Sequence, residues 1–149
     1  MSVKNLVKTD LVFAKQQISS KKRLLEQLAE SVSDRLHCNA DEVYDALLGR
    51  EKLGSTGIGN GIAIPHCRLE QVNRATLVLM SLEEPIDFDA IDRRPVDLIF
   101  ALLVPPHQCD EHLATLAQIA ELAQAEAKLN QLREKQNNED LFEAFNALL

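Results

Sequence analysis

The sequence VDLIFALLV at residues 96–104 is almost continuously apolar, and the sequence ATLVLMSL at residues 75–82 has the same character. Neither run alternates between apolar and polar residues, so both predict strands that are covered on both faces. Helical patterns precede and follow them along the chain. We therefore expect an α/β fold, a three-layer α/β/α sandwich with a central mixed sheet of about four to five strands flanked by helices.

The helical segments before these strands are marked by apolar spacing and by capping residues. At residues 20–37 apolar side chains recur every three or four positions, and Ser19 or Ser20 can act as the N-cap. Asn39 and Glu42 have the spacing of a capping box for a second helix. We expect this second helix to stop at Gly49, because glycine commonly follows the last helical residue.

The two ends of the chain complete the predicted architecture. A short first strand is expected at residues 11–14. Pro105 and Pro106 end the strand at residues 96–104, and no Gly or Pro occurs from His107 onward. This composition predicts further helices at residues 110–125, 128–135 and 140–148.

The composition narrows the class of protein. The 149 residues carry a formal net charge of −7 and a hydrophobic fraction of 46%, which fits one packed domain over residues 1–149. An acidic chain without a basic stripe argues against nucleic-acid binding. The three cysteines lie far apart, which favours a reducing compartment over a disulfide framework. No apolar run approaches the roughly 20 residues of a membrane-spanning helix, so we expect a cytoplasmic protein without membrane insertion.

A dense group of glycines marks the segment that carries the chemistry. All five glycines lie between positions 49 and 61, and GSTGIGNGIAIPH at residues 54–66 holds four of them. Glycines let backbone N–H groups turn toward an anion. The segment lacks the Gly-Lys-Ser/Thr end of a Walker A loop and the glycine spacing of a dinucleotide fingerprint. Composition alone leaves open an anion-binding loop or a connector that only needs turns.

The longer sequence GREKLGSTGIGNGIAIPH at residues 49–66 resembles the IIA domains of the fructose–mannitol class of the bacterial phosphoenolpyruvate-dependent phosphotransferase system. EEPIDFDAIDRRPVDLIFALLVPP at residues 83–106 is similar to the nitrogen-regulatory branch of this family, and HLATLAQIAELA at residues 112–123 fits it as well. The resemblance implies a phosphotransferase that accepts a phosphoryl group on a histidine and needs no cofactor. It also implies an HPr-like phosphocarrier of the nitrogen branch as donor, and regulatory target proteins as partners.

Three residues match functional positions of that family. His66 matches the phosphorylated histidine, Arg50 an arginine beside the site, and His112 a second histidine that sits against the first. The resemblance implies a phosphoryl bond at Nε2 of His66, with Nδ1 left to donate to a backbone carbonyl. A neutral imidazole is a competent nucleophile near pH 7, and a guanidinium can hold two phosphoryl oxygens. Without the motif, each of the three would be read as an ordinary surface or core residue.

Neighbouring residues extend the predicted site. Ser55, Thr56 and Asn60 can supply further hydroxyl and amide donors to the phosphoryl group. Cys67 departs from the pattern, because many family members have glycine after the histidine, and we expect local crowding there without loss of function. Apolar residues that border the motif are candidates either for a docking patch or for ordinary core: Ile58, Ile62 and Leu69.

Two other functions fit parts of the sequence. A IIA component for fructose- or mannitol-type sugar uptake would share the motif, but a chain with no attached IIB or membrane domain favours regulation. A zinc-binding protein that uses His66, His112 and Cys109 is the alternative suggested by residue types, with His107 and Cys67 nearby. The spacing His-x-Cys-x-x-His is not a common structural zinc signature, so no metal site is expected.

Overall fold

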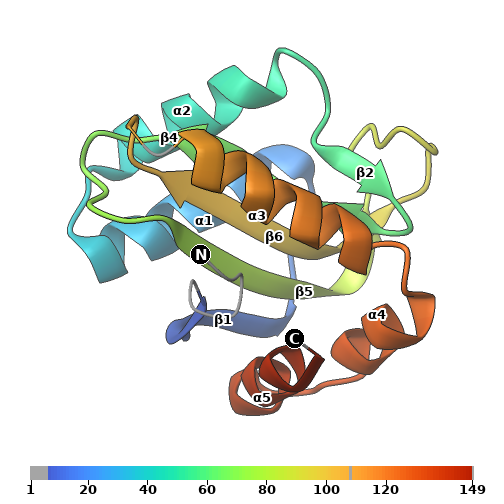
Figure 1. Cartoon of the computed structure of the whole chain (residues 1–149). Helices are drawn as coiled ribbons and strands as arrows, with labels where there is room; N and C mark the ends of the chain where they lie inside the picture. The colour runs from blue at the N-terminus through green and yellow to red at the C-terminus, as the bar shows by residue number, and fades with distance from the viewer. Residues whose placement is uncertain (1–6, 108, 149) are drawn as a thin grey trace.

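The computed structural model describes residues 7–107 and 109–148, with the side chains of residues 7–9 and 109–112 outside the described part. These residues form a mixed α/β fold with one six-stranded sheet and five helices (Figure 1). The order along the chain is β1 (Val7–Gln16), α1 (Lys21–Leu36), α2 (Ala40–Glu51), β2 (Gly57–Gly59), β3 (Ile62–Ala63), β4 (His66–Arg68), β5 (Thr76–Ile86), β6 (Val96–Val104), α3 (Cys109–Leu122), α4 (Glu126–Arg133) and α5 (Asn138–Leu148).

The sheet is mixed, as predicted. Its strand order is β1-β5-β6-β3-β2, and β4 also pairs with β6. The long strands β5 and β6 are antiparallel, β1 runs parallel to β5, and β3 and β4 run parallel to β6. The sheet has more strands than the predicted four to five because the glycine-rich segment contributes three short ones. Such strands of two or three residues are too short to show a periodic pattern.

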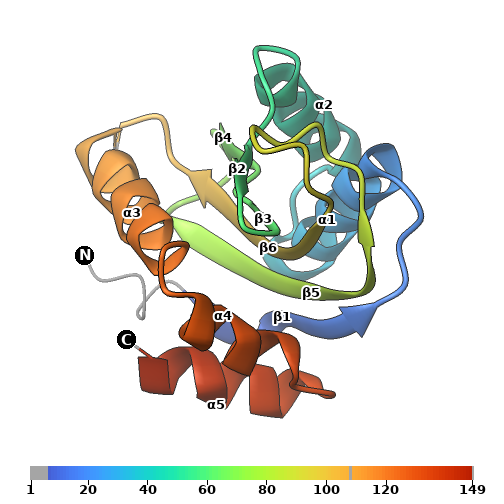
Figure 2. The ribbon, with the colours of Figure 1, turned by 90° about the vertical axis from the view of Figure 1, so that its right-hand side faces the viewer.

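The helices α1 and α2 cover one face of the sheet and α3, α4 and α5 cover the other, which confirms the layered arrangement (Figure 2). An apolar cluster packs between the sheet and each of these helical layers. Along β5, Val78 and Met80 belong to the cluster covered by α1 and α2. Leu77 and Leu79 belong to the cluster covered by α3, α4 and α5. Successive side chains of a strand point to opposite faces, so a strand with helices on both sides is apolar throughout. This explains the continuous apolar runs of β5 and β6.

The helix starts follow the predicted caps, but the end of α2 does not. Ser20 and Asn39 each accept backbone N–H groups from the first turns of α1 and α2. The prediction that Gly49 ends α2 is wrong, because the helix continues to Glu51. A glycine lowers helix stability by only about 1 kcal/mol, which the packing of the preceding turns can offset. The extra residues place Arg50 and Glu51 in the last turn of α2.

The three helices after β6 agree with the prediction drawn from the absence of Gly and Pro. The helices α4 and α5 are anchored by fully buried side chains, among them Leu129 and Phe145. Phe145 also lies against Phe100 of β6, with a distance of 5.8 Å between the ring centroids. Among the described residues, none of the helices combines the length and the apolar character needed to cross a membrane.

Candidate functional site

His66 lies at a break between two short strands. The strands β3 and β4 pair with successive parts of β6, and residues 64 and 65 interrupt them. Pro65 has no backbone N–H to donate to a ladder, which favours such an interruption. His66 is the first residue of β4 and pairs with Leu102, near the carboxyl end of β6. The break leaves the Ile64 carbonyl to accept a hydrogen bond from a side chain.

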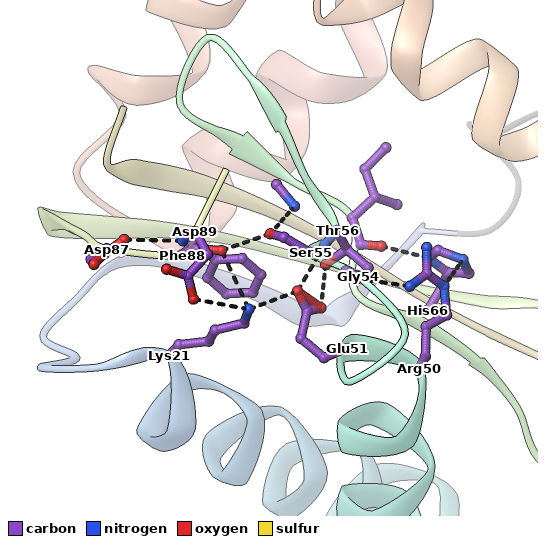
Figure 3. Close-up of polar contacts among 12 residues, drawn as sticks. Lys21, Arg50, Glu51, Gly54, Ser55, Thr56, His66, Asp87, Phe88 and Asp89 are labelled. Carbon is purple, nitrogen blue, oxygen red and sulfur yellow. Dashed lines mark hydrogen bonds and ion pairs between the residues drawn. The ribbon is translucent and has the colours of Figure 1, made fainter. Parts of the chain in front are cut away.

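The hydrogen bonds on the His66 ring define its tautomer. Nδ1 lies 2.7 Å from the carbonyl oxygen of Ile64, which can only accept. Arg50 Nε, which can only donate, lies 3.1 Å from Nε2 (Figure 3). The ring is therefore a neutral imidazole that carries its proton on Nδ1 and presents the Nε2 lone pair to Arg50. The bond from Nδ1 to a backbone carbonyl is the one expected from the sequence.

Arg50 is held in place by a second hydrogen bond. Its Nη1 donates to the carbonyl oxygen of Gly54 at 2.9 Å, while its Nε donates to His66. Arg50 comes from the last turn of α2 and His66 from β4, so two separate elements build the pair. A guanidinium held next to an imidazole nitrogen can neutralise an anion that binds at that nitrogen.

The electrostatic surroundings keep the His66 ring neutral. Burial lowers the pKa of His66 below its ordinary value of 6.5, and the charge of Arg50 acts in the same direction. The Ile64 hydrogen bond and the charge of Glu51 oppose these effects without reversing them. A ring with a lowered pKa is in its nucleophilic, unprotonated form at pH 7.

The three polar residues predicted as extra phosphate ligands make other contacts. Ser55 Oγ donates to the carbonyl oxygen of Phe88 at 2.7 Å, and the buried Thr56 donates through Oγ1 to Glu51 at 2.7 Å. Asn60 Nδ2 donates to the carbonyl oxygen of Ala123 at 2.9 Å. A role in holding phosphate would require these side chains to give up the bonds that fix their loops.

A partly buried ion pair that no sequence motif predicted lies next to Arg50. The side chain of Glu51 is only 3% exposed, and its Oε1 lies 3.0 Å from Nζ of Lys21 at the start of α1. Lys21 Nζ also lies 4.7 Å from the centre of the Phe88 ring. The sequence motifs assign no role to Glu51 or Lys21. The sequence feature that could have pointed to this pair is Thr56, whose hydroxyl lies a short loop after Glu51 and can donate to its carboxylate.

Gly57 is a position where the site tolerates no side chain. A Cβ there would lie 2.8 Å from Cβ and 2.9 Å from Cα of Ala90, closer than real contacts allow. We expect Gly57→Ala to lower the free energy of unfolding by about 1–3 kcal/mol, because the backbone must move to relieve the overlap. Urea denaturation measures this change. Gly49→Ala is the matched control: its Cβ would meet nothing within 4 Å, and we expect a gain of up to about 1 kcal/mol in helix α2. Equal effects of the two substitutions would contradict this account.

The remaining predicted site residues lie partly outside the described structure. His112 belongs to the first turn of α3, as predicted, but its side chain and that of Cys109 are outside the described residues. The zinc alternative depends on these two side chains. Among the side chains that the structure describes, no group of three His, Cys, Asp or Glu residues is placed to hold a metal ion.

Cys67 occupies the position after the histidine without disturbing the strand. Its side chain is buried in the cluster under α1 and α2, and its backbone pairs with Leu103 in β6. Burial raises the pKa of the Cys67 thiol to about 12, so the thiol stays protonated and unreactive. The side chain points into the core, which explains how a residue larger than glycine fits next to His66.

Comparison with known proteins shows the family of the chain. Residues 5–147 match the family described as "Phosphoenolpyruvate-dependent sugar phosphotransferase system, EIIA 2". A nitrogen regulatory protein from Escherichia coli is 50% identical over 125 residues, which cover 83% of this chain and 77% of that protein. The crystal structure of nitrogen regulatory protein IIA-Ntr from Neisseria meningitidis has a TM-score of 0.89 at 34% identity, covering 95% of this chain and 97% of that one.

A more distant structure shares the fold. The enzyme IIA-Mtl of Escherichia coli, solved in complex with phosphorylated enzyme IIB-Mtl, has a TM-score of 0.78 at 17% identity and covers 95% of this chain and 97% of that chain. The family match and the regulatory relatives agree with the resemblance seen in the glycine-rich motif. The chain thus belongs to the EIIA type 2 family of the phosphoenolpyruvate-dependent phosphotransferase system, within its nitrogen regulatory branch.

Proposed function

We propose that this protein is a phosphohistidine carrier that accepts a phosphoryl group on Nε2 of His66 and whose phosphorylation state is read by regulatory target proteins. The observation that carries the proposal is the pattern of hydrogen bonds on the ring. Nδ1 donates to Ile64 and the Nε2 lone pair faces Arg50. In this tautomer Nε2 is the nucleophilic nitrogen, and a cation lies next to it to receive a phosphoryl anion.

In the proposed step, a phosphorylated HPr-like carrier presents its own phosphohistidine to Nε2 of His66. The bond from Nε2 to phosphorus forms as the donor's nitrogen–phosphorus bond breaks, and Nδ1 keeps its proton against Ile64. For this bond to form, the Nε–H of Arg50 turns from the ring to a phosphoryl oxygen, which frees the Nε2 lone pair and neutralises the charge of the phosphoryl group. Positioning and charge neutralisation supply most of the catalysis in such transfers, so the chain itself needs no resident cofactor.

His112 is proposed as the second imidazole of the site, on the strength of its match to the family motif. Its backbone lies in the first turn of α3, which follows the carboxyl end of β6 after a short connection. His66 pairs with that same end of β6. The N-terminus of a helix favours an anion, so α3 and His112 would support a phosphoryl group from the same side.

The regulatory part of the proposal rests on charge and on the relatives. A phosphoryl group adds a charge of about −1.5 to −2 at pH 7, and the chain already carries a net charge of −7. This added negative charge lies at His66, so it alters which partner surfaces can bind next to the site. The relatives that share about half of their residues with this chain are nitrogen regulatory proteins, which favours regulation over sugar uptake. In the sugar-uptake alternative, a IIB domain would take the phosphoryl group from His66.

Exposed apolar side chains offer a surface for the carrier. Leu53 follows α2 and is 84% exposed, and Leu113 follows His112 in α3 and is 64% exposed. Ile58, proposed from the sequence for this role, is 37% exposed, whereas Ile62 and Leu69 are buried and belong to the core. We propose Leu53, Ile58 and Leu113 as contacts for the donor.

Phosphoryl transfer from phosphoenolpyruvate through purified upstream carriers tests the proposal. We expect stoichiometric labelling that is lost in acid and stable in base, as for phosphohistidine and unlike phosphoserine. The reaction is repeated on protein treated with a zinc chelator, and we expect the same labelling. Failure to label, acid-stable label, or loss of labelling on removal of zinc would each contradict the proposal.

The proposal also predicts how His66 responds to pH. We expect a pKa below 6.5 for its ring by NMR titration, because burial and Arg50 disfavour the charged form. The unfolded chain binds a proton at His66 near pH 6.5, whereas the folded chain binds it only at a lower pH. The neutral ring's contribution to the free energy of unfolding is therefore complete above pH 6.5. It is lost as the pH falls from there through the lower pKa of the folded state. Arg50→Met should move the pKa upward. A pKa above 6.5 in the unchanged protein would contradict the neutral ring.

A further inference from the structure

We propose that Glu51 is a positioning residue for phosphoryl transfer, because its carboxylate fixes the segment that holds Arg50 against His66. This inference rests on the proposed function of His66. Figure 3 shows the hydrogen bonds by which Glu51 acts on the position of Arg50, through Thr56 and Gly54, and this positioning is separate from the effect of the Glu51 charge on the His66 ring.

The contacts form a continuous chain from the buried carboxylate to the ring. Glu51 Oε1 accepts the backbone N–H of Thr56 at 2.7 Å, and Oε2 accepts the Thr56 hydroxyl at 2.7 Å. Thr56 is thereby fixed, and the short loop before it carries the Gly54 carbonyl that accepts from Arg50 at 2.9 Å. Arg50 in turn donates to His66 at 3.1 Å. Each contact restricts the next one.

A carboxylate at the position of Glu51 destabilises the fold unless other groups bind it. It is the last residue of α2, where the helix dipole disfavours a negative charge, and its side chain is 3% exposed. A buried carboxylate without partners destabilises a protein strongly. Lys21 and the two donors of Thr56 supply these partners. Helix stability alone would favour a neutral or basic residue here, whereas the carboxylate is matched to the loop whose Thr56 donors it accepts.

A second set of contacts ties the same segment to the loop after β5. Lys21 Nζ donates to the Phe88 carbonyl oxygen at 3.3 Å, and Ser55 Oγ donates to the same oxygen at 2.7 Å (Figure 3). Ser55 Oγ also accepts the N–H of Gly57 at 3.0 Å. The cluster therefore joins the start of α1, the end of α2 and two loops. Glu51 lies where the ion pair and the Thr56 contacts meet.

The test compares Glu51→Gln with wild type and with Glu143→Gln, a matched change at an exposed residue of α5. An amide keeps the size of the side chain, but its NH2 group cannot accept a hydrogen bond, and the partner charge for Lys21 is lost. We expect the maximal rate of transfer to His66 to fall about tenfold or more, since small displacements of a positioning group have effects of this size. The donor concentration at half-maximal rate should stay unchanged, because buried Glu51 offers no surface to the donor.

The same variants are examined by NMR without any donor. We expect the Arg50 Nε–H signal of Glu51→Gln to shift and to exchange faster with water, while Glu143→Gln resembles wild type. This measurement does not depend on phosphorylation. If wild type is never labelled, the proposed function fails, whereas the Arg50 signal still decides whether Glu51 positions Arg50.

Two results with Glu51→Gln would overturn the inference. One is a folded Glu51→Gln protein that is less stable but keeps the wild-type maximal rate and Arg50 signal, which would make Glu51 purely structural. The other is a lower rate with an unchanged Arg50 signal, which would exclude an effect through Arg50. If Glu51→Gln does not fold, Thr56→Val decides in its place, because it removes only the hydroxyl contact. We expect a smaller change of rate and Arg50 signal in the same direction, and no change in either would overturn the inference.

Discussion

His66→Ala is expected to accept no phosphoryl group from phosphoenolpyruvate in the presence of the upstream carriers. The substitution removes the nitrogen that would form the bond to phosphorus, so the loss should be complete and not a matter of rate. The ring is only partly buried, and we expect the free energy of unfolding to change by about 1 kcal/mol. Radiolabel transfer and circular dichroism of the same sample measure the two effects.

The control for this experiment is another histidine of the chain. His37 is exposed and ends α1 with a φ of 57°, a left-handed conformation that asparagine also tolerates. His37→Asn removes an imidazole without straining the backbone, and labelling should match wild type. Labelling of folded His66→Ala at the wild-type level would exclude the proposed role of His66.

Arg50→Met should be labelled about 10²–10³-fold more slowly than wild type, the usual cost of removing one group that stabilises charge in a transition state. Methionine keeps an unbranched apolar stem but loses both hydrogen bonds, to His66 and to Gly54. Arg50→Lys should fall between the two, because lysine keeps the charge but lacks the planar group that holds two oxygens. Rapid-quench measurements at saturating donor give these rates.

A matched arginine separates a site effect from a general effect of charge. Arg35 also lies in the last turn of a helix and donates through Nε to a backbone carbonyl, that of Asp10 at 3.1 Å. Arg35→Met should therefore transfer at the wild-type rate. A folded Arg50→Met protein as fast as Arg35→Met would show that the guanidinium does not assist transfer. If Arg50→Met lowers the free energy of unfolding while its folded fraction transfers as fast as Arg35→Met, Arg50 is structural.

Much of the fold was predictable because its long elements carry strong local signals. The strands β5 and β6 are apolar on both faces, and Ser20 and Asn39 cap helices in the way that their side chains favour. The end of α2 was not predictable from Gly49, because packing of the preceding turns outweighs the preference of one residue. The strands β2, β3 and β4 depend on pairing with distant segments, which no local pattern encodes.

The candidate site was also predictable only in part. His66 and Arg50 were predicted from a family motif, and the contact between them arises only when α2 and β4 meet. The roles of Glu51 and Lys21 depend on burial, which the sequence around them does not reveal. Thr56 looked like a phosphate ligand because hydroxyl groups bind anions, but its hydroxyl donates to Glu51. A polar side chain's partner is set by the three-dimensional neighbourhood more than by its type.

The most direct measurement locates the phosphoryl group itself. Protein labelled with ¹⁵N-histidine is phosphorylated through the upstream carriers, and the imidazole nitrogens are observed by NMR. The nitrogen that bonds to phosphorus should be Nε2 of His66, with Nδ1 still protonated next to Ile64. Attachment to Nδ1, to another histidine or to a hydroxyl side chain would contradict this account.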